Sequence, residues 1–220
     1  MAELRTEEEQ LQALKAWWQE NGKSLVLGVG LAIALVLGWQ GWQARQEQQA
    51  AAASALYQNL TEAAQLQAMN PQDDAQYVTA QHLAQQLKAD FTDTTYARYA
   101  GLVLAAMHVQ NADYTQARTE LEWVLSVSSE MDSIKRIATL RQAALMQQQG
   151  EVETAVSLVR DLDAGSFEAE KQELLGDLYL SLGQTEQART AYESALQASG
   201  GAANNPLLKI KRDDLAEVSS

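Results

Sequence analysis

The 220-residue chain contains no cysteine. Disulfide bonds, thiolate nucleophiles and cysteine-based zinc sites are therefore excluded. Basic residues are also scarce, because 16 Lys and Arg stand against 29 Asp and Glu and give a formal net charge of -13. Nucleic-acid binding needs clustered Lys and Arg to neutralise phosphates, so this composition argues against a nucleic-acid partner.

Proline is nearly absent, with Pro71 and Pro206 the only two. Proline interrupts helices, and the chain is rich in the helix-forming residues Ala, Gln, Leu and Glu. The composition therefore predicts an almost entirely helical protein.

Motifs of catalysis and metal binding are missing as well. His82 and His108 stand alone, without the spacing of metal ligands, and His108 fits a packing role. There is no P-loop, no G-x-G-x-x-G after a strand and no G-x-S-x-G nucleophile elbow. The sequence therefore predicts no catalytic residue, no metal, no cofactor and no enzyme.

One long apolar segment is present, KSLVLGVGLAIALVLGWQGW. Its residues 24–42, at about 1.5 Å each in a helix, roughly match a ~30 Å hydrocarbon core. A cleaved signal peptide and a buried helix are the alternatives. The preceding segment is long and acidic, and no small-x-small cleavage site follows closely. Tryptophan favours the membrane interface and flanks both ends of the segment, at Trp17, Trp18, Trp39 and Trp42. We therefore expect a retained single-pass anchor.

The charges that flank the anchor favour a cytoplasmic N-terminus. Lys15 and Lys23 precede the span and Arg45 follows it, so the positive-inside rule gives an excess of one charge. We expect residues 1–23 on the cytoplasmic side and residues 43–220 across the membrane.

Small residues recur within the span at Gly30, Ala34 and Gly38. Gly and Ala are common in membrane helices, and we prefer that ordinary explanation. The alternative is that this stripe lets another transmembrane helix approach closely.

Before the span, TEEEQLQALKAWWQENG predicts a short helix, with a capping box at Thr6 and Glu9 and a stop at Asn21-Gly22. Leu11, Leu14 and Trp18 give it one apolar face. This face either lies on the membrane or docks onto a partner, or else the segment only continues the anchor.

An internal repeat follows. The stretches ADYTQA, GEVETA and GQTEQA begin at Ala112, Gly150 and Gly183, and their spacings of 38 and 33 residues suit a helix–turn–helix solenoid. Small residues that let paired helices cross lie at equivalent places, Ala117, Ala155 and Ala188. The last unit matches the tetratricopeptide pattern most clearly, at Leu175, Gly176, Tyr179, Ala188, Tyr192 and Ala195.

The repeat region extends in both directions. A degenerate helix pair is expected over about 46–69 and 74–89. At the other end, Pro206 should begin a capping helix with Leu207, Ile210 and Leu215 on one side. The predicted fold is all-α, with a single N-terminal transmembrane helix followed by a tetratricopeptide-like α-solenoid.

Two acidic residues of the last repeat bear on ligand choice. Glu173 and Asp177 occupy places where solenoids that clamp acidic C-terminal peptides carry Lys and Asn. Like-charge repulsion should therefore reject peptides with acidic C-terminal sequences.

The N-terminal arrangement resembles the YfgM-type ancillary subunits of the bacterial SecYEG translocon. The likeness lies in E-x-x-Q, L-K-x-W-W, E-N-G-K and G-W-x-x-W elements, here at residues 7–10, 14–18, 20–23 and 38–42, the last with one intervening position fewer. The resemblance implies an inner-membrane protein with a periplasmic solenoid. It also implies association with SecYEG and with the membrane-anchored chaperone PpiD, helping exported proteins emerge and fold.

Two functions remain open. The chain is either a translocon accessory with chaperone-like or scaffolding action on exported proteins, or a membrane-tethered scaffold for another envelope complex. The anchor and the repeats fit both, and only the N-terminal resemblance separates them.

Overall fold

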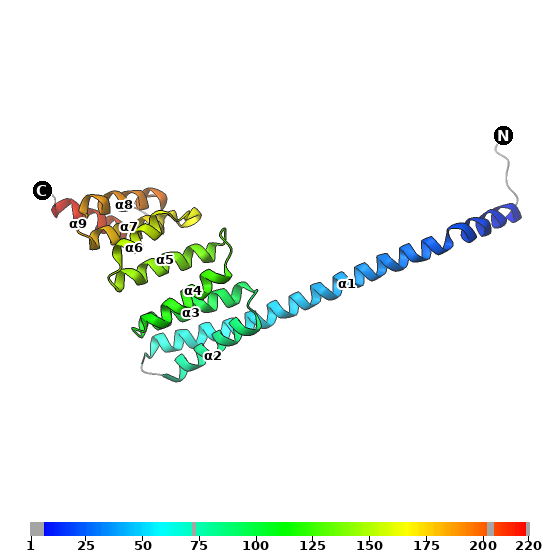
Figure 1. Cartoon of the computed structure of the whole chain (residues 1–220), viewed down its shortest axis with the longest axis horizontal. Coiled ribbons are helices and arrows are strands. Elements are labelled where there is room, and N and C mark those ends of the chain that lie inside the picture. The colour runs from blue at the N-terminus through cyan, green and yellow to red at the C-terminus, as the bar shows by residue number, and fades with distance from the viewer. Residues whose placement is uncertain (1–6, 72–73, 202–204, 219–220) are drawn as a thin grey trace. The chain divides into compact units, whose positions relative to one another are not determined.

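The computed structural model describes residues 7–71, 74–201 and 205–218, and every regular element in these ranges is a helix (Figure 1). The predicted all-α class is confirmed. The chain divides into two compact units, Met1–Ala52 and Ala53–Ser220. Thr6 of the predicted capping box lies outside the described residues.

The first helix, α1, runs from Glu7 to Met69, so it begins in the first unit and ends in the second. The predicted stop at Asn21-Gly22 is wrong. A glycine inside a helix costs only about 1 kcal/mol relative to alanine. Asn21 also donates a hydrogen bond from Nδ2 to the carbonyl oxygen of Trp17 at 3.1 Å, which supports the helix locally. Among the described residues, α1 alone is long and apolar enough to span a membrane, and its apolar window is fully exposed.

The second unit continues with helices joined by short turns. They are α2 (Asp74–Asp90), α3 (Thr95–Gln110), α4 (Tyr114–Val127), α5 (Ser133–Gln148), α6 (Val152–Arg160), the 3₁₀ turn η1 (Gly165–Phe167), α7 (Glu168–Ser181), α8 (Thr185–Ala198) and α9 (Pro206–Val218). From α2 onward each α-helix packs on the next, while α3 also contacts α5 and α5 contacts α7 (Figure 1). Contacts confined to the same helix pair and the adjacent one are the property of an α-solenoid, so this prediction is confirmed.

The three repeated stretches form the same turn. Each begins with a residue of positive φ, which is 57° at Ala112, 83° at Gly150 and 71° at Gly183. The following N–H then donates to a carbonyl near the end of the preceding helix, as in a Schellman motif. These bonds run from Asp113 to His108 at 2.8 Å, from Glu151 to Met146 at 2.9 Å and from Gln184 to Tyr179 at 2.9 Å.

The core of the second unit consists of four hydrophobic clusters. The first joins α1, α2 and α3 around Leu60, Leu87 and Leu104. The next two centre on Leu121 with Val124 and on Val159 with Leu178. Tyr192 and Leu208 form the centre of the last. No buried member of these clusters precedes Ala53.

Helix α9 closes the last cluster. It begins at Pro206 and buries Leu208 and Leu215. The predicted packing face is partly wrong, because Leu207 and Ile210 are 62% and 55% exposed. Leu207 and Leu208 are adjacent, so the sequence permits either orientation, and docking against α8 selects Leu208.

Candidate interaction surfaces

The apolar face predicted before the span is exposed in the structure. Leu11, Leu14 and Trp18 all lie on α1 with more than half of their surface exposed. The face is therefore open to lipid or to a partner within the first unit.

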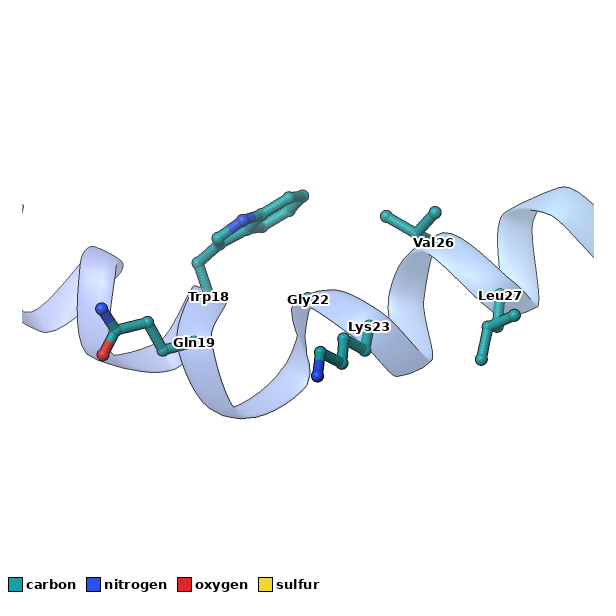
Figure 2. Close-up of a pocket in the computed structure, with 6 residues that line it drawn as sticks. All are labelled: Trp18, Gln19, Gly22, Lys23, Val26 and Leu27. Carbon is teal, nitrogen blue, oxygen red and sulfur yellow. The ribbon is translucent and has the colours of Figure 1, made fainter.

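The position of the Trp18 ring explains why residue 22 of α1 is glycine. A Cβ atom built on Gly22 would lie 3.1 Å from Cε2 of the Trp18 indole, so only glycine leaves the ring unhindered there. Figure 2 shows Trp18 and Val26 on the same side of the helix, with Gly22 between them and Lys23 directed elsewhere. Trp18, Gly22 and Val26 thus outline an open hollow along one side of α1.

The small-residue stripe of the span lies farther along α1. Gly30, Ala34 and Gly38 are exposed. A Cβ atom built on Gly30 or Gly38 would meet no atom within 4 Å. Residues four apart form a ridge along a helix surface, and ridges of this kind pack against those of another helix. The stripe therefore has room for a helix from another molecule.

The residues predicted to pack the repeats lie between paired helices. Tyr179 is half-buried, and the others are buried: Ala117, Ala155, Leu175, Gly176, Ala188, Tyr192 and Ala195. Glycine permits the closest approach at two places. A Cβ atom on Gly176 would lie 2.3 Å from Tyr192, and one on Gly101 would lie 2.6 Å from Val124. The sequence analysis did not single out Gly101.

The acidic pair on α7 is neutralised by the chain itself. Lys211 of α9 places Nζ 2.8 Å from Oε1 of Glu173 and 2.9 Å from Oδ1 of Asp177. Tyr192 donates a hydrogen bond to the same oxygen of Asp177 at 2.7 Å. Burial lowers the pKa of Lys211, but its hydrogen bonds to Glu173 and Asp177 outweigh this, and the net pKa is raised. The two carboxylates therefore hold the capping helix in place, and the sequence analysis missed Lys211.

A groove of about 400 Å³ lies between α3 and α5. Its lining includes small and apolar side chains together with two amides and one guanidinium, contributed by Ala106, Val109, Gln110, Arg141, Ala144 and Gln148. The guanidinium of Arg141 donates through Nη1 to the carbonyl oxygen of Leu102 at 3.0 Å. The sequence analysis did not single out Arg141, because its surroundings come from helices far apart in the chain.

His108 is buried between helices. Its Nδ1 lies 2.7 Å from the hydroxyl oxygen of Tyr77, and the two rings meet edge to face. Burial lowers the pKa of His108, against opposing effects of Glu120 and Asp113. The described part of the chain holds no group of three or more His, Cys, Asp or Glu residues placed to bind a metal ion. His108 thus joins α2 to α3.

The sequence matches known proteins over nearly its whole length. A family model described as a tetratricopeptide repeat-like domain matches residues 15–217. The ancillary SecYEG translocon subunit of Haemophilus influenzae is 31% identical, over 98% of this chain and 100% of that protein. The proteins of the same name from Aggregatibacter actinomycetemcomitans and Escherichia coli are 31% and 27% identical, over 98% and 96% of this chain and 100% and 97% of their own lengths.

A solved structure, that of a thermophilic tetratricopeptide-repeat protein from Thermus thermophilus, is 18% identical over 71% of this chain and 88% of that chain, with a TM-score of 0.48. The family model and the relatives cover both the apolar span and the repeats. The chain therefore belongs to the tetratricopeptide repeat-like family and is a homologue, over nearly its whole length, of the ancillary SecYEG translocon subunits.

Proposed function

We propose that this chain is a membrane-anchored, non-catalytic subunit that assists the SecYEG protein-export translocon. One observation carries the proposal: the curated relatives named for this translocon match 98% of the chain, anchor and repeats together. A likeness confined to the repeats would fit many solenoid proteins, whereas this one includes the membrane segment.

The proposed location is the bacterial inner membrane, with residues 1–23 cytoplasmic, residues 24–42 in the bilayer and residues 43–220 periplasmic. The charge excess of Lys15 and Lys23 over Arg45 supports this orientation. The exposed apolar window of α1 supports an anchor that crosses the membrane.

In this proposal two surfaces of the chain bind different partners. The face of α1 that carries Gly30, Ala34 and Gly38 contacts a transmembrane helix of the translocon. The periplasmic solenoid contacts a PpiD-type chaperone and exported clients, and its chaperone-like action is to hold chains as they emerge. The four-residue spacing of Gly30, Ala34 and Gly38 supports the first assignment. The groove between α3 and α5 supports the second.

Copurification of SecYEG with the full-length chain from native membranes tests this function. We expect the parent chain to retain SecYEG, and the triple variant Gly30→Leu, Ala34→Leu and Gly38→Leu to retain less. Model systems give effects of roughly 1–2 kcal/mol for such helix contacts. The matched control is Gly28→Leu, Ala32→Leu and Val36→Leu, which alters a face roughly 200° around the helix.

Loss of SecYEG from the triple variant alone would support the proposed division. Failure of the parent chain to copurify SecYEG would contradict the translocon role. Equal copurification by a chain whose whole span is replaced with an unrelated membrane helix would show that the solenoid recruits the translocon.

A further inference from the structure

Two rows of side chains run side by side along α1 where the apolar span begins. Residues four apart form a ridge on a helix surface, and a furrow separates neighbouring ridges. The members of the first row, called here the cationic row, are Lys15, Gln19 and Lys23. The members of the second, called here the apolar row, are Trp18, Gly22 and Val26. A charged edge therefore lies next to an aromatic and aliphatic edge.

An open hollow of about 600 Å³ lies where the two rows meet. Figure 2 shows Trp18 and Val26 along one side of it, while Gln19 and Lys23 project on the other side of Gly22. Gly22 is buried beneath the indole, because a Cβ atom there would lie 3.1 Å from the Trp18 ring. Glycine thus lets the ring lie against the helix and form a wall. Sites for small molecules have volumes of about 300–1,000 Å³, so the hollow suits one ligand molecule.

The two lysines of the cationic row have no partner of opposite charge within the described part of the chain. The ion pairs among the described residues all lie beyond α1, between Lys88 and Asp213. Lys15 and Lys23 are exposed and about 12 Å apart along the axis, with Gln19 midway between them. Because lysine has a long flexible stem, both ammonium groups can reach one external anion beside Gln19.

The lining changes from polar to apolar along the helix axis, and this order identifies the ligand. Lys15 and Gln19 lie before the span, whereas Val26 and Leu27 lie within it. A phospholipid at a membrane surface changes in the same direction, from its phosphate to its acyl chains. Lysines near the surface favour anionic lipids, and tryptophan favours this depth of the bilayer. A helix of another protein would cover the apolar row alone, whereas an anionic lipid fits both rows.

We propose that an anionic phospholipid binds in the hollow between the cationic row and the apolar row. Lys15 and Lys23 hold its phosphate, and one acyl chain packs against Trp18 and Val26. The inference goes beyond the proposed translocon role, because it concerns the anchor and a lipid and requires no other protein.

The test is native mass spectrometry of the purified full-length chain in detergent, in the absence of the translocon. The chain is titrated with dioleoylphosphatidylglycerol or dioleoylphosphatidylcholine, which have the same acyl chains and differ in net charge. One lysine near an anionic lipid surface changes binding by roughly fivefold, so we expect the anionic lipid to bind at least that much tighter. Glycerol 3-phosphate has the phosphate without the acyl chains, and an equal concentration should not displace the lipid.

The double variant Lys15→Gln and Lys23→Gln should bring the two affinities together. Its control is Arg45→Gln, which removes a cation at the other end of the span and should keep the difference. Gly22→Leu should weaken the binding of both lipids, because the new side chain displaces the Trp18 ring and fills the hollow. Leucine favours a helix more than glycine does, so α1 persists. Gly28→Leu adds the same side chain about 240° around the helix and should bind as the parent does.

Equal affinities of the parent chain for the two lipids, or the same loss of preference in Arg45→Gln as in the double variant, would overturn the inference. Displacement of the lipid by glycerol 3-phosphate, or unchanged binding by Gly22→Leu, would do so as well. Any of these results, obtained while SecYEG still copurifies with the parent chain, would leave the proposed translocon role intact.

Discussion

Gly176 of α7 and Tyr192 of α8 approach so closely that a Cβ atom on Gly176 would lie 2.3 Å from Cε1 of the tyrosine ring. The ring is 1% exposed, and its hydroxyl is held by Asp177, so it has little freedom to move aside. This contact fixes how the two helices of the last repeat cross, which explains why glycine stands at this place of the pattern.

Gly176→Ala should therefore destabilise the solenoid. Overpacking of a core typically costs about 1–3 kcal/mol. The measurement is urea unfolding of a fragment of residues 43–220, whose core clusters are independent of the anchor. Tyr192→Leu in the same background should recover part of the loss, since the smaller side chain makes room. Additive effects of the two changes would contradict direct contact.

Ala112→Gly should stabilise the same fragment. Ala112 has a φ of 57°, where the equivalent turns have glycine. A left-handed conformation costs a residue with a Cβ atom about 1–2 kcal/mol, and part of this gain is offset by the greater freedom of glycine in the unfolded chain. The reciprocal change Gly150→Ala should destabilise. Urea midpoints that move in the same direction for both variants would refute this account of the turns.

Lys211→Met should loosen α9, because the methionine keeps the apolar stem but leaves Glu173 and Asp177 unpaired. Hydrogen bonds to charged groups contribute about 1.5–3 kcal/mol, and partial exposure of this cluster reduces the effect toward the lower end. Amide hydrogen exchange should become faster throughout α9. Lys209→Met is the control, since Lys209 pairs with Asp213 of the same helix at 3.0 Å. Equal exchange rates in the two variants would show that Lys211 does not hold the helix.

The stability of the solenoid should fall below pH 6.5 in a way that depends on His108. Burial lowers the pKa of His108 from its ordinary 6.5, so in that range the unfolded chain binds more protons than the folded chain. Protonation therefore favours unfolding as the pH falls, and the free energy of unfolding rises with pH. Urea unfolding between pH 5 and 8 should show a weaker dependence for His108→Gln than for the parent fragment. His82→Gln, which changes an exposed histidine, should follow the parent. Parallel curves for all three proteins would exclude His108.

Local patterns predicted the parts of this fold that depend on near neighbours in sequence. The turns at Ala112, Gly150 and Gly183 were recognisable because each needs a small residue after one helix and before the next. The continuity of α1 was not recognisable. Gly22 ends a helix only where the residues that follow it do not form a helix themselves. The buried side of α9 was also missed, since adjacent leucines satisfy the same periodicity.

The chemistry of the surfaces was hidden for a different reason. Lys211 meets Glu173 across 38 positions of sequence, so its ion pair becomes visible only when α7 and α9 are placed side by side. Arg141 stands out because no carboxylate of the described residues forms an ion pair with it. Such a property depends on every neighbour of the side chain and on no motif.

The central claim, that the small-residue face of α1 contacts the translocon, is tested most directly by photo-crosslinking in native membranes. A photoreactive residue at Ala34 is compared with one at Ala32, which is the same residue type roughly 200° around the helix. The account predicts a crosslink from position 34 to a SecYEG subunit and none from position 32. A crosslink to SecYEG from position 32 alone, or from neither position, would contradict it.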